Sequence, residues 1–586
     1  MKFIKIYSFA LLFVFPIVLF AQTESVDQDV MKKIRNEGLL NSKVMDIAFN
    51  ITEVSGPRVT NSPGFMRAAN YAMNQFTQWG LVNSRLDPWG DFGKGWELEK
   101  SYVSMTTPWY RSLIAYPKTW SAGSNGPQSG EVLLISAKDT LALEAYRGKL
   151  KGKVLILDYL INFEQSYKPA AVRRTDEELQ KLSEVTEAED TAAMRRRSIR
   201  NNVQNGLPRN ALLALKKMAI NEGAIAILSS ASENNAGTVF VLQAGPYKIS
   251  DPDNFLDIAI GLEDYNMIVR LLRNTTPVKM EVDVKTKFQT TDTKGYNVIA
   301  EIPGTDKNLK EEIVMLGAHL DSWPAANGAT DNAAGVSVMM EAVRILKAIG
   351  IQNKRTIRIA LWSGEEQGLL GSRGYVKKIF GDPSTMKLLP AHDQFSAYYN
   401  LDYGTGKILG IHLQGNEAAR SIFKTWFEPF NDLRAKTITI QNTGSTDHIS
   451  FDAIGLPGFQ FVQDRIITQH SNMDSYDHLM PDDLKQSATI MAAFLYNSAM
   501  RDEKLPRKVL PKALSVEGAI NLVESAAKKD IQEDDFLRVR NKAIFELLYS
   551  SGLRLSELLG IDLEPVQSKD YESSGWVDFE AGEVMV

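Results

Sequence analysis

The chain has 586 residues, of which 44% are hydrophobic and 23% are charged, and its formal net charge is −5. These values are typical of a globular protein of several domains, and they give no general attraction to nucleic acid. The absence of cysteine excludes disulfides, thiol nucleophiles and thiolate metal ligands, so any metal must be bound by carboxylates and by some of the six histidines.

The first 21 residues have the pattern of a secretory signal peptide. Lys2 and Lys5 precede an apolar run over residues 8–20, and Ala21 follows that run. The run is too short to cross a membrane comfortably. We therefore expect residues 1–21 to be removed, and we expect a mature protein without a membrane span in the periplasm or outside the cell.

Two regions with different sequence patterns follow the signal peptide. Residues 22–129 are predicted to begin with helices. Residues 130–262 contain short apolar runs, such as 131–135 and 152–157, and one amphipathic stretch near 211–222. This alternation predicts a separate β-rich domain inserted into the chain.

Residues 263–506 are predicted to form an α/β domain with a largely parallel sheet flanked by helices. A periodic stretch over 332–346 predicts a helix between two of the strands. The strands are expected from near-continuous apolar runs, which are typical of buried parallel strands. These runs are 312–316, 356–362, 395–401 and 458–462.

Acidic and histidine side chains follow each of these strands. In an open α/β sheet, ligands bind beyond the carboxyl ends of the strands, where such side chains converge. The candidate residues are His319 and Asp321 after the first strand, Asp331 before the helix, Glu365 and Glu366 after the second strand, Asp402 after the third and His470 after the fourth.

Nitrogen and oxygen donors of this kind favour zinc, and to a lesser degree cobalt or manganese. Asp331 lies in a turn rich in glycine and alanine, where its short side chain could bridge two metal ions. Asp321 is placed to accept the second imidazole proton of His319. The adjacent pair Glu365-Glu366 could supply one metal ligand and one general base for metal-assisted hydrolysis.

The motifs His319-Leu-Asp-Ser-Trp, Gly328-Ala-Thr-Asp331 and Ser363-Gly-Glu-Glu366 resemble the zinc exopeptidases of metallopeptidase family 28, and its carboxypeptidase-Q-like branch most. The likeness covers roughly residues 22–506, and it implies an aminopeptidase-like fold with two zinc ions. It assigns His319 and Asp402 to one ion, Glu366 and His470 to the other, and Asp331 to both.

The same resemblance assigns Glu365 the role of general base and places a cis peptide bond at Asp331-Asn332. Residues 130–262 resemble the protease-associated domain of many relatives, so 22–129 and 263–506 would together form the peptidase. The resemblance implies hydrolysis of terminal peptide bonds in dipeptides or short peptides, by metal-activated water. It does not separate aminopeptidase, carboxypeptidase and dipeptidase, and it leaves the oligomeric state open.

Other readings of these residues remain. Among the remaining histidines, His448 and His478 compete with His470 for the last ligand position, whereas His392 and His412 have no matching context. A binding protein without catalytic activity, or a glutaminyl cyclase that uses one zinc ion, could also be built on the same fold.

The last 80 residues differ in sequence pattern from the rest of the chain. A linker rich in proline and lysine begins at 507, and helices are expected near 515–529 and 536–559. The segment Ser551-Gly-Leu-Arg554 resembles the start of the catalytic domain of Xer-type tyrosine recombinases. No His-x-x-Arg box or tyrosine motif follows it, so 507–586 is expected to be a truncated tail that binds no nucleic acid.

Overall fold

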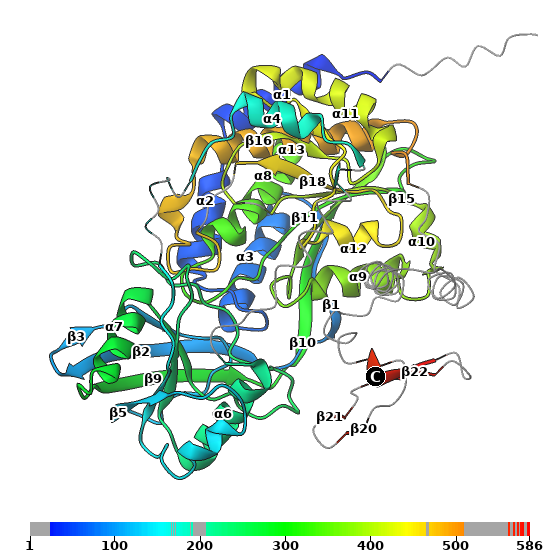
Figure 1. The fold of residues 1–586 in the computed structure, drawn as a ribbon. Helices are drawn as coiled ribbons and strands as arrows, with labels where there is room; N and C mark the ends of the chain where they lie inside the picture. The colour runs from blue at the N-terminus through cyan, green and yellow to red at the C-terminus, as the bar shows by residue number, and fades with distance from the viewer. Residues whose placement is uncertain are drawn as a thin grey trace, which may run out of the picture.

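Two eight-stranded sheets organise the chain in the computed structural model (Figure 1). The structure describes residues 24–508, apart from 164, 166, 168, 170, 188, 191–206, 403 and 465–467, together with strand residues between 561 and 585. The expected signal peptide and the expected tail helices lie outside the described residues.

The first sheet carries the strands that were expected to hold the site. Its order is β1-β10-β12-β11-β15-β18-β16-β17, and its central strands β12, β11, β15 and β18 run parallel. The bounds are β1 Val82–Asp91, β10 Lys294–Ile302, β11 Ile313–His319, β12 Thr356–Trp362, β15 Phe395–Asn400, β16 Ile408–His412, β17 Thr437–Thr439 and β18 Gly458–Gln463.

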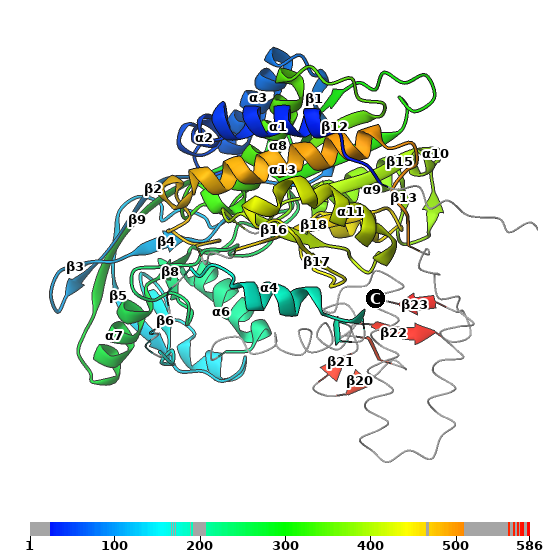
Figure 2. The same cartoon turned by 90° about the horizontal axis from the view of Figure 1, so that it is seen from above.

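Helices cover both faces of this sheet. One face packs against the largest apolar core, in which α1, α8 and α13 also contact one another (Figure 2). The helices of this face are α1 Gln28–Leu40, α2 Val44–Phe49, α3 Pro63–Gln78, α8 Ala334–Ala348, α11 Arg420–Phe427 and α13 Pro481–Met500. The other face packs against α9 Leu370–Ile379, α10 Pro390–Asp393 and α12 His448–Asp452.

The second sheet has the order β3-β2-β9-β5-β6-β7-β8-β4. Alternate residues of its central strands point to α7 on one face and to α6 on the other. Its elements are β2 Gly95–Thr107, β3 Arg111–Ser112, β4 Ala115–Pro117, β5 Gln128–Ile135, β6 Val154–Leu157, α6 Arg209–Glu222, β7 Ala226–Ser229, β8 Asp257–Ile260, α7 Leu262–Arg273 and β9 Lys279–Gln289.

The second sheet is inserted between two neighbouring strands of the first. β1 pairs antiparallel with β10 in the first sheet, and β2 pairs antiparallel with β9 in the second. We expected the inserted unit over 130–262. The strands of its sheet run from Gly95 to Gln289, because β2 and β9 are paired along almost their whole length.

Shorter elements complete the described chain. Helix α4 (Asp176–Ser183) leaves the second domain and packs on β17 of the first sheet; it begins with a capping box formed by Thr175 and Glu178. The remaining short elements are η1 Asn50–Val54, η2 Ala142–Tyr146, η3 Ala329–Ala333, β13 Gly381–Asp382, β14 Lys387–Leu388, η4 Glu417–Ala419, η5 Glu428–Leu433, η6 Tyr476–His478, β19 Ile561–Asp562, β20 Gln567–Ser568, β21 Tyr571–Glu572, β22 Gly575–Asp578 and β23 Glu583–Met585.

The predicted α/β class, with a mixed and partly parallel sheet flanked by helices, is confirmed. All four predicted strands of the first sheet are present, and the predicted helix over 332–346 is α8. Every residue of β11 is buried, which explains why its sequence is a continuous apolar run. Within the described residues, no helix is long and apolar enough to cross a membrane.

Phe494 tests how strongly α13 is held on the first sheet. Its ring is fully buried, with its centroid 5.2 Å from that of Phe461 on β18 and 4.7 Å from that of Phe427 on α11. Phe494→Ala should lower the free energy of unfolding by about 3–5 kcal/mol, measured by urea denaturation, because it leaves a cavity. Phe49→Ala is the control, since Phe49 is 47% exposed; an equal loss in both variants would contradict this account.

Candidate metal centre

The predicted ligands converge at one edge of the first sheet. His319 is the last residue of β11, Glu365 and Glu366 follow β12, and Asp402 follows β15. His470 lies in the loop after β18, and these four strands are neighbours in the sheet. The carboxyl ends of parallel strands meet at the same edge, which explains why residues far apart in sequence come together.

Asp331 lies at the centre of the cluster, in the turn η3 between β11 and α8. Its Oδ1 atom is 3.1 Å from Nε2 of His319, and its Oδ2 atom is 3.0 Å from Nε2 of His470. Each oxygen of one carboxylate thus faces a different imidazole. This is the arrangement of donors that a carboxylate bridging two metal ions requires.

One further carboxylate accompanies each imidazole. Oδ1 of Asp402 is 3.2 Å from Nε2 of His319, and Oε2 of Glu366 is 3.0 Å from Nε2 of His470. Zinc bonds of about 2.0–2.2 Å place the donors of a tetrahedral site about 3.3–3.6 Å apart, close to these separations. The donors therefore divide into two sets that share Asp331.

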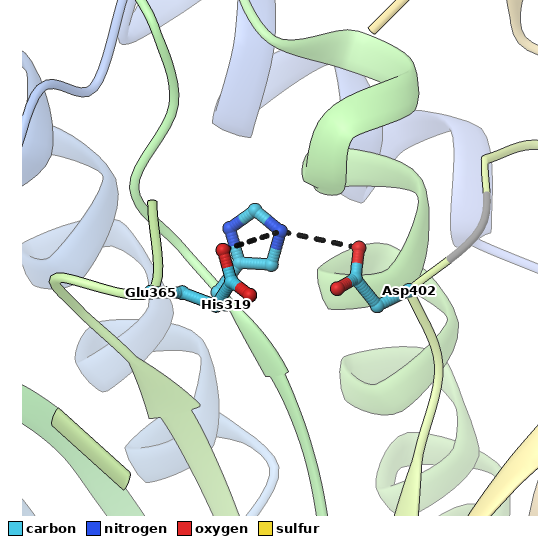
Figure 3. A group of neighbouring side chains, drawn as sticks. All are labelled: His319, Glu365 and Asp402. Atoms are coloured by element: carbon cyan, nitrogen blue, oxygen red, sulfur yellow. Dashed lines mark hydrogen bonds and ion pairs between the residues drawn. The ribbon is translucent and has the colours of Figure 1, made fainter. Parts of the chain in front are cut away.

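Glu365 lies beside the first set. Its Oε2 atom is 4.0 Å from Nε2 of His319, farther than the oxygen of Asp402, and the two carboxylates approach the same ring nitrogen from different sides (Figure 3). The side chain is 9% exposed. Glu365 thus lies next to the candidate ligands, but its carboxylate is farther from an imidazole nitrogen than the carboxylates of those ligands are.

The burial of these acidic groups makes bound cations favourable here. Loss of hydration raises the pKa of Glu366 to about 7 and raises the pKa of Glu365 well above its usual range. Oε1 of Glu366 is also buried without a hydrogen-bond partner. Two divalent cations would supply the missing positive charge and a partner for this oxygen, so the residues present fit a pair of zinc ions.

Asp321 differs from our expectation in its contacts. Nδ1 of His319 lies 3.0 Å from the backbone oxygen of Asp321, whereas the carboxylate oxygen Oδ1 is 3.8 Å away. The imidazole proton is therefore accepted by the backbone, which leaves Nε2 facing the cluster. The carboxylate is used elsewhere: it accepts hydrogen bonds from the backbone N–H groups of Glu365 and Glu366 and from the Thr60 hydroxyl.

Three supporting side chains were not assigned from the sequence. Asp474 accepts hydrogen bonds from the backbone N–H groups of Thr330 and Asp331, and Trp323 donates one from Nε1 to Oε2 of Glu366 at 2.7 Å. The buried Arg58 guanidinium donates to the backbone oxygens of residues 320, 327 and 328, which lead into the turn. No local sequence signal identified these contacts, because each joins segments distant in the chain or uses an ordinary loop residue.

The competing histidines lie apart from the cluster. His448 is buried beside Gln414 and Thr443, and burial lowers the pKa of its imidazole to about 3. His478 pairs with the hydroxyl of Ser475 through Nδ1. His470, by contrast, has its Nε2 atom 3.0 Å from a carboxylate oxygen of Asp331 and 3.0 Å from one of Glu366. The peptide bond Asp331-Asn332 is cis, as the resemblance implied.

Comparison with known proteins agrees with this geometry. Residues 297–495 match the family model described as peptidase family M28. Carboxypeptidase Q of Mus musculus is 30% identical over 253 residues, which are 42% of this chain and 51% of that protein. The chain therefore spans about half the length of the curated relatives it matches.

A solved structure supports the fold over a longer range. The crystal structure of a peptidase M28 precursor from Shewanella amazonensis aligns with a TM-score of 0.58 and 22% identity, and it covers 83% of this chain and 99% of that one.

The tail has a relative of its own. Tyrosine recombinase XerC 1 of Ralstonia nicotianae is 51% identical over 87 residues, which are 15% of this chain and 25% of that protein. This match agrees with the recombinase-like segment recognised in the sequence and is unrelated to the residues of the candidate metal centre. The candidate ligands and Glu365 all lie within residues 297–495, the part of the chain that matches the model of peptidase family M28.

Proposed function

We propose that the protein is a two-zinc exopeptidase that hydrolyses terminal peptide bonds of dipeptides or short peptides. The observation that carries the proposal is the sharing of Asp331, whose two oxygens face His319 and His470 at 3.1 and 3.0 Å. A single-metal site needs no such shared carboxylate. A catalytic centre with two metal ions needs one donor between them and a set of donors on each side.

We assign a separate role to each residue of the site. His319 and Asp402 would hold one zinc ion, His470 and Glu366 would hold the other, and Asp331 would serve both. When bound, the zinc ions act as Lewis acids on the peptide carbonyl and on the attacking water. Asp321 keeps the Glu365-Glu366 turn in place through hydrogen bonds to both backbone N–H groups.

Glu365 is the proposed general base. It is adjacent to the ligand set, but its oxygen is 4.0 Å from Nε2 of His319, farther than the oxygens of Asp331 and Asp402, which leaves it available to a water molecule. The carboxylate accepts a proton from the attacking water and returns it to the leaving amine.

Further parts of the proposal rest on sequence. We place the protein in the periplasm or outside the cell because residues 1–21 have the pattern of a signal peptide. We assign 130–262 to a protease-associated domain and 507–586 to a recombinase-like tail without a role in catalysis. We propose that the enzyme recognises the free amino end of its peptide substrate.

The first prediction concerns metal content and substrate. The purified chain should hold two zinc ions, measured by elemental analysis, and should hydrolyse unblocked dipeptides. Removal of zinc by a chelator should abolish hydrolysis, and added zinc should restore it. Acetylation of the amino end should prevent cleavage, whereas amidation of the carboxyl end should not; the reverse result would make the enzyme a carboxypeptidase.

The outcomes also separate the other functions possible on this fold. Two zinc ions without hydrolysis of any peptide in the panel would favour a binding protein. One zinc ion, with cyclisation of a peptide that begins with glutamine, would favour a glutaminyl cyclase. Either result would overturn the proposed function.

The second prediction concerns the base. Glu365→Gln should lower kcat by about 10²–10⁴-fold while both zinc ions remain bound, because the amide keeps the shape of the side chain but cannot accept the proton. Glu311→Gln is the matched control: it makes the same chemical change on a side chain that is 74% exposed, and it should leave kcat unchanged. Full activity in Glu365→Gln would show that another group acts as the base.

A further inference from the structure

The loop that carries His470 is bound by the second domain through its backbone. The N–H of Val241 donates to the oxygen of His470 at 2.8 Å, and the N–H of Asn472 donates to the oxygen of Val239 at 3.1 Å. Phe240 and Ser471 lie opposite each other as an antiparallel bridge. A short stretch of the inserted domain therefore adds itself to the ligand loop as a strand would.

The side chain of Asn472 extends this contact. Its Oδ1 atom accepts a hydrogen bond from the N–H of Val239 at 2.7 Å, and its Nδ2 atom donates to the oxygen of Gly237 at 3.0 Å. Both ends of one amide are thus used across the boundary between the domains. We call residues 237–241 and 470–472, joined in this way, the interdomain clamp.

The clamp is anchored in the core of the second domain. Asn234 accepts a hydrogen bond from the N–H of Phe240 at 2.9 Å and donates to the oxygen of Ile260, the last residue of β8, at 3.2 Å. Val239 and Val241 are fully buried and pack with Ala259 of the same strand. A displacement of residues 237–241 would therefore have to disturb β8.

On the other side, the same loop sets two of the proposed ligands. It carries His470, and two residues after Asn472 it carries Asp474, which binds the N–H groups of Thr330 and Asp331. His470 has φ of 59°, a left-handed conformation that is unfavourable for a non-glycine residue and needs support from its surroundings. Its side chain is 35% exposed, against 1% for His319, so its own domain encloses it less.

We propose that Asn472 is a positioning residue for the second zinc ion, and that the inserted domain controls the metal affinity of the peptidase domain through the interdomain clamp. This inference rests on the proposed two-zinc function. The amide holds His470 in its left-handed conformation with the imidazole directed at Asp331 and Glu366. Groups that orient metal ligands in this way typically contribute 10–100-fold to metal affinity.

The test measures zinc affinity. The full chain, Asn472→Ala and Asn254→Ala are each equilibrated with zinc buffered by a competing chelator, and bound zinc is counted. Asn254 is the matched control, because its amide also makes two hydrogen bonds to the backbone, here donating to the oxygens of Trp120 and Pro246, but makes them within the inserted region and not to residues 470–472. We expect the second zinc ion of Asn472→Ala to be bound about 10–100-fold more weakly, while the first ion of that variant and both ions of the control are unchanged.

A variant on the opposite side of the clamp gives the same test without altering the peptidase loop. Asn234→Ala removes the anchor of residues 237–241 and should weaken the second zinc ion in the same direction, even if Asn472→Ala fails to fold. Hydrogen exchange should increase at residues 468–474 in both variants and stay unchanged there in the control.

The possible failures can be told apart. Two zinc ions of unchanged affinity in Asn472→Ala and Asn234→Ala would overturn the role of the clamp and leave the peptidase intact. Fewer than two zinc ions in the unaltered chain would overturn the two-zinc function, and the inference with it.

Discussion

The position of the Asp331 carboxylate between two imidazoles is the constraint around which the candidate centre is arranged. Its two oxygens are each about one hydrogen-bond distance from a histidine nitrogen, 3.1 and 3.0 Å. Asp474 fixes the backbone of this turn, and Arg58 fixes the segment that leads into it. If the turn moved away, Asp331 would no longer face both imidazoles, and the two proposed zinc ions would lose the ligand that they are proposed to share.

Much of the fold and of the ligand set could be predicted from the sequence. Strands of the first sheet such as β11 and β15 are buried on both faces, so each can be recognised in the single sequence as an apolar run. The acidic and histidine residues stand at the ends of these runs or in the loops that follow them, so the convergence of the strand ends brings them into one cluster. The order of His319, Asp331, Glu365 and Glu366 along the chain then matched a known family.

The remaining features could not be predicted because they depend on contacts between distant segments. We expected the carboxylate of Asp321 to accept a hydrogen bond from the His319 imidazole. The backbone oxygen of Asp321 accepts it instead, and the carboxylate accepts a hydrogen bond from the turn after β12. Strand β2 has no alternating burial pattern, since four consecutive exposed residues separate two buried stretches, so its place in the second sheet follows from its pairing with β9. The sequence around Asn472 gives no sign of its hydrogen-bond partner, which lies more than two hundred residues earlier.

The insertion point of the second domain has a consequence for folding. β1 leaves the first sheet at Asp91 and β10 enters it at Lys294, and these two residues are partners in one ladder. The whole inserted domain thus occupies the place of a hairpin turn. Once β2 and β9 have paired, the ends of the insertion are already adjacent, and the entropy of closing so long a loop no longer opposes the pairing of β1 with β10. Prior folding of the inserted domain would therefore favour closure of the edge of the sheet that contains it.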